Sequence, residues 1–181
     1  MRKIWEISRR RFLGLLGVLG LLRAVPQIEG KAQRPPSTPA PGYKVLTSHQ
    51  VETLGAIADQ IIPPDQDLGA RDAGAVRYID GVLAGDQKGK RPLYAAGIAG
   101  IDESSRKMFG KEFIKLEFDA QTQVLKAIEQ GNAQGDTWKK QSRQQFFFTV
   151  WQHVLEGFYG PPEHGGNKDY VSWKMVGFPH H

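Results

Sequence analysis

Residues 146–158 read FFFTVWQHVLEGF, and this stretch carries the strongest structural pattern in the chain. Apolar side chains recur in it at intervals of three and four residues, which places them along one face of an α-helix. Phe146 and Phe148 lie off that face, so the helix is apolar on nearly all sides. Such a helix is either central to the fold or covered by another chain. The apolar face consists of Phe147, Val150, Trp151, Val154, Leu155 and Phe158.

Four further helices are expected upstream of this stretch, each with its own start or stop signal. Thr47 and Gln50 form a capping box before an apolar run that Pro63 ends. A proline at the first turn and a glycine after the last turn are common at helix ends, and both occur here. The predicted helices start at Thr47, Asp72, Pro92 and Asp119, and the last two end at about Phe109 and at Gly131.

Strand-type alternation is confined to one short segment, Phe113–Phe118. The sequence therefore predicts an all-α domain of about five helices over residues 47–181. Its last part, residues 160–181, has no helical period and is expected to be an irregular tail rich in aromatic residues.

The charge and cysteine content exclude several classes of function. The 181 residues carry a formal net charge of +5, but residues 1–32 hold seven basic and two acidic residues and account for all of it. The remainder is neutral, whereas a nucleic-acid-binding body needs a basic surface. We therefore expect no nucleic-acid partner. With no cysteine, the chain has no disulfide, thiolate zinc site, cysteine-ligated iron–sulfur cluster, covalent c-type haem or catalytic thiol.

The N-terminal segment, residues 1–32, has the pattern of a signal peptide for the twin-arginine pathway. Its apolar run at residues 12–22 is too short to cross a bilayer, which takes about 20 residues. Glycines keep that run only mildly hydrophobic, and Arg23 follows it directly. The predicted export signal is Arg9, Arg10, Phe12 and Leu13.

This signal predicts a periplasmic protein that is cleaved after Ala32. Two alternatives remain open at this point: a cytoplasmic protein with a basic amphipathic start, and an uncleaved anchor at the membrane surface. Residues 33–46 are rich in proline and are predicted to form a semi-rigid linker outside the core.

The chain lacks the common cofactor-binding motifs. Its 21 glycines include no pair at spacing i, i+2, so it has no Rossmann fingerprint. We expect no flavin, nicotinamide or nucleotide site of these kinds, and neither a cofactor nor a catalytic residue on this chain. His153, Glu156 and His164 are the candidates for a metal site, but His-x-x-Glu alone is a weak signal.

The C-terminal segment is the most unusual part of the sequence. Gly165-Gly166-Asn167 can form a tight turn with left-handed backbone. Large aromatic residues with polar tips follow it, and such residues often anchor protein interfaces. In the alternative interpretation the tail covers the helical core, with Trp173 inward. The predicted partner-interface residues are Phe146, Phe148, Tyr159, Asn167, Tyr170, Trp173 and Phe178.

Several motifs together resemble the gluconate 2-dehydrogenase subunit 3 family. They are the arginine motif at residues 8–13, ADQIIP at 58–63, DAG at 72–74 with YID at 78–80, and EGFYGPP at 156–162 followed by GGN at 165–167 and WKMVGFP at 173–179. The resemblance covers nearly the whole chain. It implies a small subunit of a membrane-bound, flavin-dependent sugar or sugar-acid dehydrogenase.

The resemblance further implies a division of labour among subunits. A large flavoprotein of the glucose–methanol–choline type would carry FAD and oxidise the substrate, and a multihaem cytochrome c would carry haem c. The small subunit would support maturation of the flavoprotein and its export by the twin-arginine translocase. The leading hypothesis is thus a non-catalytic partner-binding subunit. The alternatives are an independent periplasmic metal-dependent enzyme that uses His153, Glu156 and His164, and a membrane-tethering adaptor.

Overall fold

The computed structural model describes residues 38–179. Six α-helices and several 3-10 turns lie in this part of the chain, and no strand occurs in it. The all-α prediction is confirmed. The helices are α1 (Ser48–Ile61), α2 (Ala75–Ala84), α3 (Arg91–Phe109), α4 (Phe118–Glu129), α5 (Arg143–Tyr159) and α6 (Val171–Met175).

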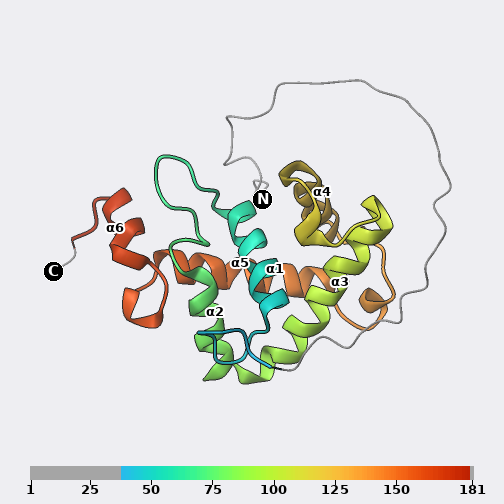
Figure 1. Ribbon diagram of the computed structural model, residues 1–181, viewed down its shortest axis with the longest axis horizontal. Helices are drawn as coiled ribbons and strands as arrows, with labels where there is room; N and C mark the ends of the chain where they lie inside the picture. The colour runs from blue at the N-terminus through green and yellow to red at the C-terminus, as the bar shows by residue number, and fades with distance from the viewer. Residues whose placement is uncertain (1–37, 180–181) are drawn as a thin grey trace. The chain divides into compact units, whose positions relative to one another are not determined.

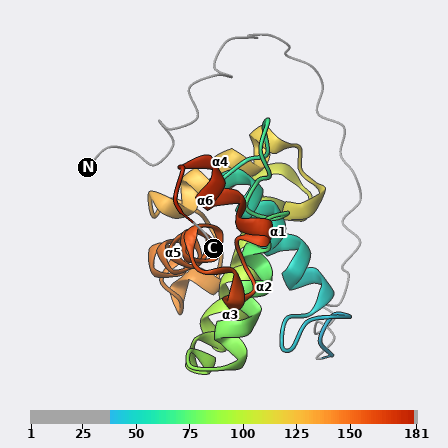
Figure 2. The ribbon, with the colours of Figure 1, turned by 90° about the vertical axis from the view of Figure 1, so that its left-hand side faces the viewer.

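Helix α5 is the centre of the domain. It runs across the molecule in Figure 1 and packs against each of the other five helices. Figure 2 looks along α5 from the side of α6, with α4 above it and α1, α2 and α3 to its right. Side chains from several faces of α5 are buried, so of the two alternatives that its sequence allowed, the central helix holds. The buried residues of α5 are Phe146, Phe147, Val150, His153, Val154, Gly157 and Phe158.

Two glycines on α3 determine how closely that helix approaches its neighbours. A Cβ atom added at Gly97 would overlap the ring of Phe146, and one added at Gly100 would overlap the ring of Trp138. The two rings are 6.3 Å apart and fill the groove that the glycines leave on α3. Phe146 is only 1% exposed, so the expectation that it faces a partner is wrong.

The predicted helix boundaries hold with one clear exception. Thr47 caps α1 in a capping box as expected, and α3 ends at Gly110 in left-handed conformation. The start of α2 differs, because Gly74 and not Asp72 is the N-cap, with φ of 92°. Residues 70–74 form turns before the helix begins. The last of them must be left-handed, and glycine adopts that conformation without steric cost.

The segment expected to be strand-like forms a 3-10 turn, Phe113–Lys115. Side chains of α3 and α4 form hydrogen bonds with the backbone of this turn, as a partner strand would. The N–H of Phe113 donates to Asp102 Oδ1 at 3.1 Å, and its carbonyl accepts from Gln121 Nε2 at 3.1 Å.

The C-terminal tail is more regular than predicted, since it contains the 3-10 turns Pro162–His164 and Lys168–Tyr170 as well as α6.

The described part of the predicted linker, residues 38–46, packs on α2. The carboxylate of Asp80 is 4% exposed and accepts hydrogen bonds from the N–H groups of Lys44, Val45 and Leu46 at 2.6, 2.9 and 3.0 Å. Ala40 and Leu46 are buried. The expectation that this stretch stays outside the core is therefore wrong for its second half. A buried carboxylate that satisfies three N–H groups holds this segment in place.

Within residues 38–179, no helix has both the length and the apolar character needed to cross a bilayer.

Candidate functional site

The C-terminal segment is attached to the body by close main-chain contacts at glycines. A Cβ atom at Gly166 would overlap the carbonyl oxygen of Gly157 on α5, and one at Gly74 would lie 2.8 Å from the carbonyl oxygen of Gly165. Hydrogen bonds fix the same contact, from Asn167 N to Gly157 O at 2.8 Å and from Lys168 N to Ala73 O at 2.9 Å. We call this contact the glycine joint. It brings residues 72–74 and 165–168 together, although they lie far apart in the sequence.

Asn167 is the structural centre of this segment. Its side chain is fully buried and donates to Gly160 O at 3.0 Å. Its Oδ1 accepts from the N–H and the hydroxyl of Ser172, at 3.0 and 2.8 Å. Asn167 therefore ties α5, the loop and α6 together. It is not available to a partner, so its prediction as an interface residue is wrong.

Backbone strain is concentrated in the turn that leads to α6. Asn167, Asp169 and Tyr170 all have positive φ, at 43°, 56° and 59°, and they are the non-glycine residues with this conformation in the described part of the chain. Such conformations persist where the surroundings enforce them, and they occur often at functional sites. The side chains of Asp169 and Tyr170 in this turn are both exposed.

Aromatic side chains gather on the outer side of this segment. The indole N–H of Trp173 donates to Tyr159 O at 2.8 Å. The rings of Tyr170 and Phe178 lie 5.6 and 5.0 Å from that of Trp173. Tyr159 and Phe178 are 49% and 54% exposed. We call this group, which consists of Tyr159, Tyr170, Trp173 and Phe178, the aromatic surface.

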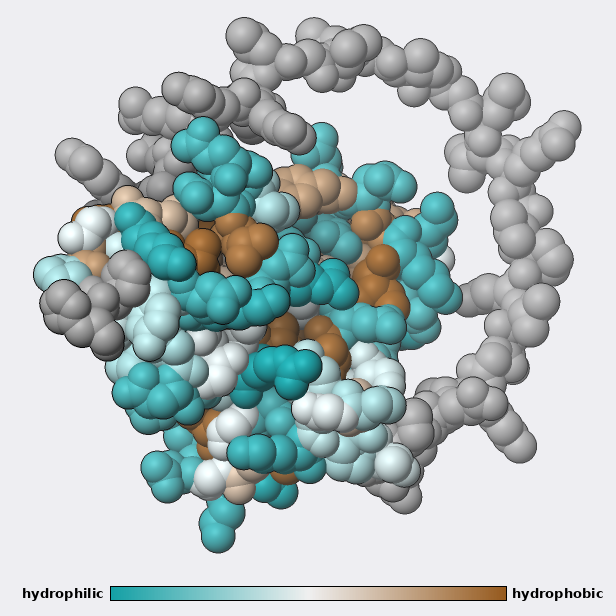
Figure 3. Space-filling model, turned by 60° about the vertical axis from the view of Figure 1, so that its left-hand side comes forward, coloured by the Kyte–Doolittle hydropathy of each residue, from teal (hydrophilic) through white to brown (hydrophobic). Residues whose placement is uncertain are grey.

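Other exposed apolar residues are more scattered. Phe148 is 47% exposed, but it lies eleven residues before Tyr159 on α5, about three turns away. Figure 3 shows one face of the molecule as mostly hydrophilic, with hydrophobic residues in small separate areas. The structure thus brings four of the seven predicted interface residues together in the aromatic surface and leaves Phe148 apart from them.

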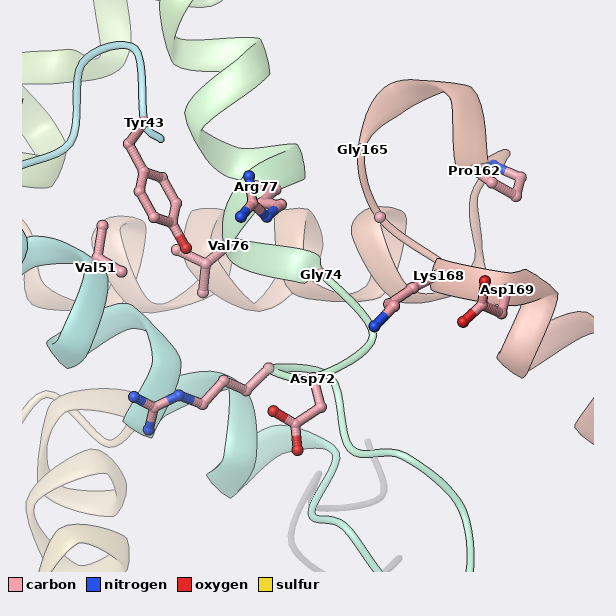
Figure 4. A pocket seen from close by; sticks show the side chains of 12 residues that line it. Tyr43, Val51, Asp72, Gly74, Val76, Arg77, Pro162, Gly165, Lys168 and Asp169 are labelled. Atoms are coloured by element: carbon pink, nitrogen blue, oxygen red, sulfur yellow. The ribbon is translucent and has the colours of Figure 1, made fainter. Parts of the chain in front are cut away.

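A pocket of about 610 Å³ lies beside the glycine joint. Figure 4 shows Tyr43, Val51, Val76 and Arg77 at one end of it and Asp72, Lys168 and Asp169 at the other. The guanidinium of Arg77 lies over the ring of Tyr43, 5.4 Å from its centroid. The linker segment held by Asp80 places Tyr43 in this position. Sequence reasoning missed the pocket, because its walls come from three separate segments whose charged residues form no recognisable motif.

The predicted metal ligands do not meet in one site. His153 is buried, and both of its ring nitrogens have partners. Its Nε2 faces Gln87 Oε1 at 2.9 Å, and its Nδ1 faces the Tyr94 hydroxyl at 2.7 Å. Because the amide oxygen can only accept, Nε2 carries the proton and Nδ1 accepts from Tyr94. Burial lowers the pKa of His153 and raises the pKa of Tyr94, so both side chains are neutral.

Glu156 belongs to a different pair. It accepts from the Tyr78 hydroxyl at 2.8 Å and from Gln152 Nε2 at 2.7 Å. Burial and then the Glu156 carboxylate raise the pKa of Tyr78 to about 12. His164 is exposed on the loop that precedes the glycine joint. Among residues 38–179, no three histidine or acidic side chains are grouped so that they could hold a metal ion.

The predicted export residues, Arg9, Arg10, Phe12 and Leu13, lie outside the residues that the structure describes.

Comparison with known proteins identifies one family. The family model described as gluconate 2-dehydrogenase subunit 3 matches residues 48–179. The matched region includes all six helices and the glycine joint. The chain matches no curated protein and no solved structure.

Proposed function

Since the chain belongs to the gluconate 2-dehydrogenase subunit 3 family, we propose that it is the non-catalytic small subunit of a periplasmic, FAD-dependent dehydrogenase complex. In this proposal a large flavoprotein of the glucose–methanol–choline type binds FAD and oxidises a sugar, sugar acid or polyol. A multihaem cytochrome c subunit carries haem c and passes the electrons on. The small subunit supports maturation of the flavoprotein and its export.

The aromatic surface is the observation that supports a partner-binding role. Exposed tyrosine and tryptophan side chains bury a large area on binding, and they lose little conformational entropy if they are already ordered. Here the indole of Trp173 is fixed by its hydrogen bond to Tyr159 O, and the segment that carries it is held by the glycine joint. The aromatic surface is therefore preorganised for a partner, and we assign it to the flavoprotein subunit.

The export role rests on residues 1–32. The twin-arginine pathway carries folded proteins, so a flavoprotein that has already bound FAD can cross the membrane if it is attached to a subunit with the signal. The proposed location is the periplasm, with the complex held at the inner membrane. In this scheme the small subunit supplies the export signal for both proteins, which consists of Arg9, Arg10, Phe12 and Leu13.

Co-expression of the chain with its flavoprotein subunit tests this function. The flavoprotein is expected in the periplasmic fraction with the full chain, and in the cytoplasm when residues 1–32 are deleted. The double substitution Arg9→Lys, Arg10→Lys is the sharper variant, because it keeps the charge and the length of the segment. A second variant, Arg2→Lys, is the matched control and is expected to export normally. Flavoprotein that reaches the periplasm with the double variant would contradict the escort role.

A further inference from the structure

The pocket beside the glycine joint contains charged side chains that the fold does not use. The glycines there serve the close approach of two main-chain segments. By contrast, Asp72, Lys168 and Asp169 form no side-chain hydrogen bond or ion pair with any residue in 38–179. All three side chains are exposed on the rim of the pocket, where a bound molecule can reach them.

The two ends of the pocket differ in character. One end has an apolar wall formed by Tyr43, Val51 and the buried Val76, with the guanidinium of Arg77 over the Tyr43 ring. Arg77 Nη1 donates to Gly42 O at 3.4 Å, but no carboxylate of the described residues lies within ion-pair distance of Arg77. Both lining carboxylates, Asp72 and Asp169, lie at the other end with Lys168 (Figure 4). The remaining cation, Arg71, already pairs with Asp59 at 3.6 Å.

This distribution defines what fits at the apolar end. A ligand that covers Arg77 removes water from its charge, and an anionic group compensates this loss most strongly. The wall beside it accepts an apolar group, and the volume of about 610 Å³ is within the range of pockets that hold several side chains. The complementary group is thus an apolar side chain next to a carboxylate.

The pocket is also continuous with the aromatic surface. Asp169 lines the pocket and is followed directly by Tyr170, whose ring packs on Trp173. The two residues share the turn with positive φ angles, in which Asp169 lines the pocket and Tyr170 contacts Trp173. A protein that sits on the aromatic surface therefore reaches the rim of the pocket.

From these observations we infer that the pocket receives a segment of the flavoprotein subunit in which an aspartate or glutamate neighbours an apolar residue. The carboxylate pairs with Arg77, and the apolar side chain packs on Tyr43, Val51 and Val76. This inference rests on the proposed function and adds a second, charge-dependent contact to the aromatic surface.

Charge reversal tests the inference. Full-length chains with Arg77→Glu or with Lys140→Glu are compared for binding to the purified flavoprotein at low and high salt. Lys140 is exposed on the loop before α5 and lies outside the pocket, so the control makes the same change of charge. Arg77→Glu is expected to weaken binding about tenfold or more at low salt and to reduce its salt dependence, while Lys140→Glu binds like the unaltered chain. Circular dichroism and the melting temperature establish that both variants are folded.

The outcomes separate this inference from the proposed function. Equal binding by the Arg77→Glu and Lys140→Glu chains overturns the inference. If Trp173→Ala at the same time abolishes binding, the partner role still stands. If the unaltered chain fails to bind the flavoprotein, the proposed function itself fails. A dimer of the isolated chain that is lost with Arg77→Glu would identify a second copy as the occupant and would also overturn the inference.

Discussion

At the residue scale, His153 shows how a side chain with catalytic potential is used in the fold. Its ring stacks on that of Tyr94 at 5.9 Å and has hydrogen-bond partners at both nitrogens. The sequence identified His153 as a candidate ligand because it precedes Glu156 by three residues. It could not reveal the real partners, which are 59 and 66 residues away along the chain. A histidine in a helix gives no sign of what it faces across the core.

The buried imidazole predicts a loss of stability in acid. Burial, the largest effect, and the charge of Lys90 lower the pKa of His153, while Glu156 opposes them. The folded-state pKa is thus below the unfolded value of 6.5, so below pH 6.5 the unfolded chain binds a proton that the native chain does not. The neutral imidazole therefore contributes its full share to the free energy of unfolding above pH 6.5. As the pH falls from 6.5 toward the folded-state pKa, the free energy of unfolding decreases by at most about 1.4 kcal/mol per pH unit.

Urea unfolding of the unaltered chain and of His153→Gln at pH 7.5 and 5.5 measures this effect. The glutamine cannot titrate, so the variant is expected to lose less stability between the two pH values. All other titratable groups are the same in both proteins, so effects common to the two cancel in the comparison. Parallel pH profiles for the two proteins would show that His153 does not titrate differently on folding.

At the scale of helices, the contact between α3 and α5 depends on Gly97. Gly97→Ala is expected to lower the free energy of unfolding by about 1–3 kcal/mol, because the new methyl group meets the ring of Phe146. This loss would appear although alanine is the better helix former by about 1 kcal/mol. The matched control is Gly81→Ala on α2, where the nearest atom is 3.9 Å away. That variant is expected to be neutral or more stable, and denaturant unfolding of both proteins provides the measurement.

A Gly97→Ala protein as stable as the Gly81→Ala protein would show that the groove on α3 is not tightly filled.

The groove on α3 also explains why the prediction for Phe146 was wrong. Periodicity located most of the buried face of α5, although Trp151 and Leu155 are only partly buried. It placed Phe146 outside that face and therefore toward a partner. The side chain is buried because α3 offers a gap between two glycines, and the pattern of one helix contains no information about the surface of another.

At the scale of the whole molecule, the helices were predictable and their assembly was not. Capping residues and apolar periods lie within short stretches, so the positions of α1, α3, α4 and α5 followed from local sequence. The glycine joint brings together residues about 90 positions apart. The hydrogen bonds from the N–H groups of residues 44–46 to the carboxylate of Asp80 span about 35 positions. The pocket depends on both long-range contacts, and for this reason only the aromatic surface was anticipated from the sequence.

The joint itself gives the prediction at this scale. Gly166→Ala is expected to destabilise the protein by about 3 kcal/mol and to release the C-terminal segment, because a Cβ there overlaps the main chain of α5. Gly89→Ala is the control, since a Cβ atom added there would have no neighbour within 4 Å and its φ is not left-handed. The melting temperature and the rate of limited proteolysis within residues 168–179 report the two effects. Identical melting curves for these variants would mean that the main-chain contact is dispensable.

Because Gly157 and Gly166 meet through their backbones, the geometry of that contact is independent of the side chains that project from the other side of the segment. Mutations in those projecting positions can accumulate during evolution without disturbing the helical core. The same separation leaves the exposed positions of residues 168–179 open to substitution, whereas the buried Ser172 has to stay to hold Asn167.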